Sequence, residues 1–352
     1  MITIFGSENS PYSKKVHSYA RYKNIPHEWK TDIRRGQTQK EYQEVAKLPL
    51  VPAIRTISGE GMQDSTPIME YLDQQYPNAI STRLPSNELN FISVLLEEFG
   101  DEWANKWMFH FRWHRAIDQR IVSLRLAKEM LGNNGTEEAL VQMSDQIRRR
   151  MSGRGFAVGS NRVTAPMIER SFKAGVEQLE RHLSTRPYLF GKRPCWGDFG
   201  IGCQIYQALI DPTAGEHLVN HAPRVVQWCT AVMVGSRVLH VSSDEWETWE
   251  TLAPTLLPFV TEQVGELFLA WSNANSQCIV SKKNECVVEL PTGYGTWTNK
   301  VGGPQKYQHK SLQMLRKKYK VYKTKGLDDI LKQSKCYDVL NANSHGTSQS
   351  KL

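Results

Sequence analysis

Several features that often reveal a protein's class are missing from this sequence. Its 352 residues contain no apolar run of 18 or more, which excludes a helix spanning a bilayer. The first residues, Met1–Gly6, lack a basic leader followed by a long apolar stretch. We therefore expect a first strand at this end of the chain and no signal peptide.

Cysteine is absent from the first half of the chain. The six cysteines lie at positions 195, 203, 229, 278, 286 and 336, and they form no Cys-x-x-Cys or Cys/His pattern with zinc-ligand spacing. Free thiols in a reducing compartment are the simplest interpretation, so we expect a cytoplasmic location and no metal site.

The net charge of +8 is not spread along the chain. The segment Lys306–Lys335 holds ten Lys or Arg against Asp328 and Asp329, which accounts for the whole excess. A basic nucleic-acid-binding protein would distribute such charge over its folded surface, so we expect no nucleic-acid partner. The apolar fraction of 40% provides for a sizeable core and excludes disorder of the whole chain.

Strand and helix patterns alternate over residues 1–77. Short strands at Ile2–Phe5 and His27–Thr31 and a hairpin around Ser58–Gly61 are interleaved with helical stretches. The resulting order β-α-β-α-β-β-α predicts a small α/β domain of thioredoxin type. Prolines at 77 and 85 bound a linker, which we place at 78–87.

The rest of the chain changes character. Helical periodicity predicts an all-helical domain over 88–240, and a C-terminal extension over 241–340 that packs on the body as a small α+β unit. Within it we expect a hairpin of Cys278–Val280 with Cys286–Leu290, and a basic helix over Gln305–Tyr322. Residues 341–352 are polar, and we expect a disordered tail there.

The basic helix carries apolar residues at helical spacing on one face. These are Leu312, Leu315, Tyr319 and Tyr322. A free basic arm would not need them, so we expect this helix to dock on the folded body and leave its basic face in solvent. The competing hypothesis is an acidic partner such as an anionic membrane or nucleic acid.

Three short motifs in the first domain point to chemistry. Ser10-Pro11-Tyr12-Ser13 follows the first strand and is typical of a capped helix start. Val51-Pro52 places a proline at the start of a strand, where the preceding residue can offer its backbone to a ligand. Asp64-Ser65 opens a helix whose free N–H groups attract carboxylate or phosphate. Each motif alone is weak, but their order and spacing are specific.

In these motifs the sequence resembles the cytosolic glutathione transferase superfamily, over about two-thirds of the chain. Ser10–Ser13 is similar to its active-site turn, Val51-Pro52 to its cis-proline, and Asp64-Ser65 to the pair that holds the γ-glutamyl end of glutathione. Pro194–Phe199 is similar to the capping stretch of its helical domain, with Cys195 where Ser or Thr is usual. The resemblance implies a thioredoxin-like domain followed by an all-α domain, glutathione as co-substrate, and a homodimer.

The resemblance also implies that a hydroxyl stabilises the glutathione thiolate. A free thiol, with a pKa of about 8.5, is mostly protonated at neutral pH, and a hydroxyl donor at a helix N-terminus favours the anion. Ser10 suits this catalytic role, with Ser13 and Tyr12 as alternatives. No cysteine occupies 10 or 13, so the turn cannot form a mixed disulfide with glutathione.

The second substrate in this family lies against the helical domain. We expect large residues of Glu88–Arg115 there, with Trp107, His110 and Phe111 as pocket candidates, although plain core positions explain most of these aromatic side chains as well. The predicted reaction is conjugation of glutathione to a small apolar electrophile. A glutathione-dependent ether-cleaving or lyase-type enzyme and a non-catalytic binding or scaffold protein remain the alternatives.

Overall fold

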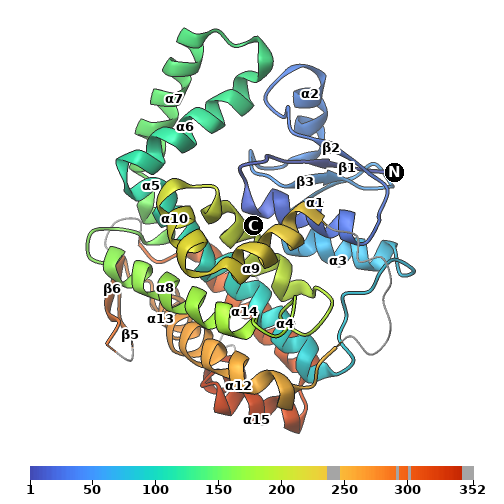
Figure 1. The fold of residues 1–352 in the computed structure, drawn as a ribbon, viewed down its shortest axis with the longest axis vertical. Coiled ribbons are helices and arrows are strands. Elements are labelled where there is room, and N and C mark those ends of the chain that lie inside the picture. Colours follow the sequence, from blue (N-terminus) through green and yellow to red (C-terminus); the bar gives the residue numbers. More distant parts are fainter. Residues whose placement is uncertain (236–245, 291–292, 300–302, 343–352) are drawn as a thin grey trace.

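In the computed structural model, a small sheet with its helices sits at one end of a larger helical body (Figure 1). The structure describes residues 1–235, 246–290, 293–299 and 303–342. The expected tail over 341–352 and the boundary at 240 fall largely or wholly outside these ranges. Within the described ranges, no helix combines the length and hydropathy needed to cross a membrane.

The N-terminal region is a four-stranded sheet in the order β2-β1-β3-β4 with three helices. Strand β1 pairs parallel to β2 and antiparallel to β3, and β3 pairs antiparallel to β4. The elements are β1 (Ile2–Phe5), α1 (Pro11–Tyr22), β2 (His27–Lys30), α2 (Gly36–Val45), β3 (Ala53–Arg55), β4 (Gly61–Gln63) and α3 (Ser65–Gln75). This order is the predicted β-α-β-α-β-β-α.

Alternation along the strands explains the layers around this sheet. Ile4 and Ile54 belong to the main core, on the face that α1 and α3 cover, whereas Phe5 and Ala53 pack with Tyr42 of α2 on the opposite face. Successive strand residues point to opposite faces, so adjacent apolar positions serve two separate layers. The thioredoxin-like fold class is confirmed.

Helices joined by loops make up residues 87–235. They are α4 (Asn87–Phe99), the π-helix η1 (Gly100–Ala104), α5 (Asn105–His114), α6 (Ala116–Leu131), the 3-10 turn η2 (Gly132–Asn134), α7 (Glu137–Ser152), η3 (Gly155–Val158), α8 (Ala165–His182), α9 (Trp196–Leu209), α10 (Pro212–His221), α11 (Pro223–Thr230) and η4 (Ala231–Gly235). The apolar α9 runs through the centre against α4, α5 and α1. A Cβ added at Gly100 would meet the backbone of Gly200 at 2.3 Å, so these glycines permit a close approach of η1 and α9.

The C-terminal region wraps around this body. It comprises α12 (Trp249–Phe259), the π-helix η6 (Val260–Leu269), α13 (Ala270–Val280), the hairpin β5 (Cys286–Leu290) and β6 (Gly295–Asn299), α14 (Lys306–Tyr322), α15 (Lys325–Gln333) and α16 (Tyr337–Asn341). Helix α14 lies against α13 and α4. Leu312, Leu315 and Tyr319 are at most 2% exposed, and Tyr322 packs against the core.

The expected hairpin in this region is wrong in one strand. Cys278–Val280 ends helix α13, and β5 pairs instead with β6, with Val288 opposite Trp297. Trp297 is completely buried, and its ring lies 5.7 Å from Trp103 and 5.9 Å from Trp271. Residues 295–299 therefore form the partner strand of β5, and Trp297 on this strand packs against tryptophans far away in the chain.

Candidate functional site

The three predicted motifs emerge at one edge of the sheet. Phe5 pairs with Ala53, and Ala53 pairs with Gln63. The turn after β1, the proline before β3 and the aspartate after β4 therefore leave the sheet side by side. The Val51–Pro52 peptide bond is cis. The juxtaposition that the motif order predicts thus follows from the register of three neighbouring strands.

Ser10 begins helix α1 at this edge. It has extended backbone angles (φ −101°, ψ 121°), and its Oγ accepts a hydrogen bond from the Ser13 N–H at 3.3 Å. Pro11 takes the first helical position, where its missing N–H costs nothing. The Ser10 side chain remains partly exposed, so its hydroxyl can still reach a ligand outside the turn.

The two alternative hydroxyls are less accessible. Ser13 is completely buried, and its Oγ finds no hydrogen-bond partner among the residues that the structure describes. The hydroxyl of Tyr12 donates to the carbonyl oxygen of Asp101 at 2.8 Å, and burial raises its pKa well above the usual range. Ser10 and Tyr12 are both partly exposed residues, but the Tyr12 hydroxyl already donates to Asp101, whereas the Ser10 hydroxyl acts as an acceptor in the turn and keeps its proton for a ligand.

Hydrogen bonds from the helical body fix the position of this turn. The buried Arg112 donates from Nη1 to the Asn9 carbonyl oxygen at 2.8 Å and from Nε to Asp211 Oδ2 at 2.7 Å. Arg125 Nε donates to Asn9 Oδ1 at 2.8 Å, and Gln207 Nε2 to the Glu8 carbonyl oxygen at 2.8 Å. Through these contacts Arg112 anchors the Ser10 turn to the helical body.

Asp64 and Ser65 start helix α3 in different environments. Asp64 has φ +81° and an exposed side chain, whose Oδ2 accepts a hydrogen bond from the hydroxyl of Tyr307 at 2.7 Å. Ser65 is 1% exposed, and its Oγ lies 3.3 Å from both Asp101 Oδ2 and Lys15 Nζ. The Ser65 hydroxyl therefore faces the interior, while the first N–H groups of α3 remain available at the helix terminus.

A buried charged cluster lies directly under these motifs. Lys15 Nζ contacts Glu97 Oε1 at 2.5 Å and Asp101 Oδ2 at 2.7 Å, and all three groups are at least nine-tenths buried. Thr66 Oγ1 donates to the same Glu97 oxygen at 2.5 Å. The cluster joins α1, α3, α4 and η1, and so ties the motif-bearing edge to the helical body.

Burial and mutual repulsion set the charges of this cluster. Burial, opposed by Lys15, raises the pKa of Asp101 to about 7, and burial together with Glu97 and Asp101 raises that of Glu98 to about 8. Although burial opposes it, attraction to Lys15 lowers the pKa of Glu97 below its usual value. Near neutral pH Lys15 and Glu97 are therefore charged, whereas the carboxyl groups of Asp101 and Glu98 are partly protonated.

Sequence reasoning missed Lys15, Glu97, Asp101 and Tyr307. A signal for Lys15 exists: Tyr12, Lys15 and Tyr19 are spaced i, i+3, i+7, which places the lysine on the inward face of α1. No comparable signal exists for Tyr307, which comes to Asp64 from 243 residues away.

The candidates for a second-substrate pocket lie in the core. Trp107, His110 and Phe111 are 1%, 1% and 3% exposed. Trp107 Nε1 donates to Ser171 Oγ at 2.9 Å, and His110 contacts Ser160 and Glu169. In this conformation none of the three offers a surface to a ligand.

One described group of side chains could hold a metal ion. One ligand atom each of His110, His114 and Glu169 lies within 4.8 Å of the others. Burial lowers the pKa of His110 to about 4, which keeps the ring neutral. However, Arg115 Nη2 contacts Glu169 Oε1 at 2.6 Å and His110 Nε2 lies 3.1 Å from the same oxygen, so protein groups already engage this carboxylate oxygen.

Residues 4–80 match the family model described as "Glutathione S-transferase, N-terminal domain". Among solved structures, the chain is similar to the tau class glutathione S-transferase of mango, Mangifera indica (16% identity, covering 73% of this chain and 98% of that one, TM-score 0.41). It is also similar to the beta-etherase LigF of Sphingobium sp. strain SYK-6 (16%, 67% and 96%, 0.43). A third is a Methylobacterium radiotolerans glutathione S-transferase in complex with glutathione sulfonate (15%, 70% and 99%, 0.39). No curated protein matches.

Proposed function

We propose that this protein binds glutathione and conjugates it to a small apolar electrophile; the match of residues 4–80 to the glutathione S-transferase N-terminal domain model supports this. The observation that carries the proposal is the meeting of the Ser10 turn, the cis Val51–Pro52 bond and the start of α3 at one edge of the sheet. This edge offers a hydroxyl, an open backbone segment and a helix N-terminus to one extended ligand.

In this proposal the γ-glutamyl end of glutathione binds at α3. The exposed Asp64 carboxylate faces the ammonium group through Oδ1, since Tyr307 occupies Oδ2. The ligand carboxylate meets the N–H groups of the first turn of α3, where the helix dipole favours negative charge. Because the Ser65 hydroxyl points inward, the Ser65 contribution comes from its backbone N–H. The cysteinyl backbone of glutathione pairs with Val51.

The thiol then lies at the Ser10 turn. Its proton passes to solvent, and the Ser10 hydroxyl donates a hydrogen bond to the resulting thiolate. The thiolate sulfur forms a bond to an electrophilic carbon, whose leaving group departs with its bonding electrons. Serine at both 10 and 13 rules out a mixed disulfide at this turn, which favours conjugation over thiol–disulfide exchange.

The first experiment measures glutathione binding by thermal shift and calorimetry. We expect saturable binding, and no binding of cysteinylglycine, which lacks the γ-glutamyl group that Asp64 and α3 recognise. Asp64→Ala should abolish the shift, whereas Asp32→Ala, which changes an exposed aspartate outside the motifs, should leave it unchanged. Absence of glutathione binding in the unmodified protein would reject the proposal.

The second experiment measures catalysis with an electrophile panel. It contains 1-chloro-2,4-dinitrobenzene for conjugation and a β-aryl ether for the ether-cleaving alternative. Glutathione binding without turnover on any compound would favour the non-catalytic binding protein, an alternative that the inward-facing Ser65 hydroxyl also supports.

The proposal includes a cytoplasmic homodimer. All six cysteines are buried and free, which agrees with a reducing compartment. Light scattering on the purified protein tests the dimer.

A further inference from the structure

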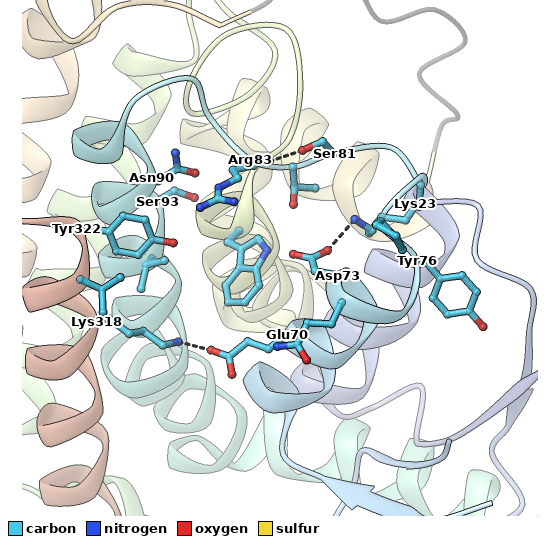
Figure 2. A pocket seen from close by; sticks show the side chains of 17 residues that line it. Lys23, Glu70, Asp73, Tyr76, Ser81, Arg83, Asn90, Ser93, Lys318 and Tyr322 are labelled. Atoms are coloured by element: carbon cyan, nitrogen blue, oxygen red, sulfur yellow. Dashed lines mark hydrogen bonds and ion pairs between the residues drawn. The ribbon is translucent and has the colours of Figure 1, made fainter. Parts of the chain in front are cut away.

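A cavity opens toward the C-terminal end of helix α3, whereas the predicted glutathione motif Asp64-Ser65 lies at the N-terminal end of this helix. It encloses about 570 Å³ between the C-terminal ends of α1 and α3, the linker after α3, the start of α4 and helix α14 (Figure 2). This volume lies in the range of sites that hold drug-sized ligands. It shares no lining residue with Ser10, Pro52, Asp64 or Ser65.

The wall of this cavity carries more positive than negative side chains. Lys23 Nζ pairs with Asp73 Oδ1 at 2.7 Å, and Lys318 Nζ pairs with Glu70 Oε1 at 2.8 Å. Arg83 also lines the cavity and points into it in Figure 2, and no carboxylate of the described residues pairs with its guanidinium. Two carboxylates against three cations leave one positive charge, which belongs to Arg83.

Most of the uncharged polar groups in the wall are already engaged. Asn90 Nδ2 donates to the carbonyl oxygens of Leu84 and Ser86, both at 2.6 Å, and Ser93 Oγ accepts from the Gly197 N–H at 3.3 Å. Thr82 Oγ1 lies 2.9 Å from the Tyr19 hydroxyl. The side chains of Gln74, Tyr76 and Tyr322 also line the cavity and add an amide and two hydroxyls, but Arg83 is the cation there that no described carboxylate pairs with.

The remaining wall is aromatic and apolar. Trp196 Nε1 donates to the Tyr19 hydroxyl at 3.0 Å, which fixes the indole, and the ring stays partly exposed. Tyr322 faces the cavity from α14, its ring centroid 6.3 Å from that of Phe91 (Figure 2). Fixed aromatic faces favour a flat apolar body, because stacking adds to the area that is buried.

We propose that this cavity binds aromatic carboxylates, with the ring between the Trp196 and Tyr322 side of the wall and the carboxylate on Arg83. A planar guanidinium presents two parallel N–H donors that match a carboxylate. The site also gives the C-terminal region a role, since α14 supplies Lys318, Val321 and Tyr322 to the wall. It does not depend on the proposed glutathione chemistry.

The test is calorimetry on the full chain with 2-naphthoate and, as its uncharged match, 2-naphthamide. We expect saturable binding of one 2-naphthoate per chain and at least fivefold weaker binding of 2-naphthamide. Arg83→Gln should weaken 2-naphthoate about fivefold to tenfold and leave 2-naphthamide unchanged, since it removes a charge-assisted hydrogen bond. Arg21→Gln, which changes another exposed arginine outside the cavity, should change neither.

Two further arms locate the ligand. Tyr322→Leu should weaken both probes, because it removes an aromatic wall and no charge. Saturating glutathione should not displace 2-naphthoate, because the two predicted sites share no residue. The proposal is overturned if 2-naphthoate does not bind, if Arg83→Gln binds it as tightly as the unmodified protein, or if glutathione displaces it competitively.

Discussion

The hydroxyl of Tyr307 donates a hydrogen bond to Oδ2 of Asp64 at 2.7 Å, and so links helix α14 to the first turn of α3. Desolvation of the hydroxyl, although Tyr307 as a whole is 57% exposed, and the Asp64 carboxylate raise the pKa of the Tyr307 hydroxyl, which keeps it protonated and makes it the donor. A residue from the C-terminal region thus orients the carboxylate that we place on the ammonium group of glutathione.

Tyr307→Phe should therefore weaken glutathione binding without changing the fold. Loss of one hydrogen bond to a charged group at an exposed position should cost about 1 kcal/mol, or roughly fivefold in Kd by calorimetry. Tyr322→Phe on the same helix is the matched control and should leave the affinity unchanged. Equal glutathione affinities in the unmodified and Tyr307→Phe proteins would show that Asp64 needs no support from α14.

Ser10→Ala should reduce turnover far more than glutathione affinity. Its hydroxyl interacts most strongly with the thiolate, so its loss acts on the reactive anion and should lower kcat roughly a hundredfold, as for other single donors to a developing anion. Steady-state kinetics with 1-chloro-2,4-dinitrobenzene and the pH at which the bound thiol ionises measure this effect. Ser13→Ala is the control, because Ser13 is completely buried. If Ser13→Ala loses turnover and Ser10→Ala keeps it, the roles are exchanged.

The buried carboxyls make stability depend on pH. Burial and repulsion by Glu97 and Asp101 raise the pKa of Glu98 from 4.5 to about 8. Between these values the folded protein keeps a proton that the unfolded chain releases, so the free energy of unfolding falls as pH rises from about 4.5 to 8. Each pKa unit of difference corresponds to about 1.4 kcal/mol.

Glu98→Gln removes this ionisation while keeping the shape of the side chain. We expect the variant to unfold at higher denaturant than the unmodified protein at pH 8, with the difference shrinking toward pH 5. Glu216→Gln, which changes an exposed glutamate of α10, should show no such trend. A parallel pH dependence in all three proteins would contradict a raised pKa at Glu98.

The local parts of the site could be predicted because they depend on neighbours in sequence. Ser10 before Pro11 predicts the start of a helix, and Val51-Pro52 before Ala53 predicts a proline at the beginning of a strand. Both lie where expected. The strand register then brings them together with Asp64. Their roles toward glutathione remain predictions.

The long-range contacts could not be predicted in this way. The ion pairs of Lys15 join residues 82 and 86 positions apart, and no local pattern distinguishes a lysine that is paired in the core from one in solvent. The Ser65 hydroxyl points inward because it contacts Asp101 of the buried charged cluster. A helix-capping pattern in the sequence predicts the backbone conformation but not the direction of this hydroxyl. The strand at Trp297 likewise depends on tryptophans elsewhere in the chain.

Docking of α14 should contribute strongly to stability, and two adjacent residues test this. Leu315 is 1% exposed, whereas Met314 beside it is 51% exposed. Leu315→Ala leaves a cavity in the packed interface and should lower the free energy of unfolding by about 2–5 kcal/mol. Met314→Ala should change it by less than about 0.5 kcal/mol, since it removes little buried surface. Urea unfolding followed by circular dichroism measures both variants. If α14 were a free basic arm, the two substitutions would have equally small effects, and Lys318 would not need its partner Glu70 on α3.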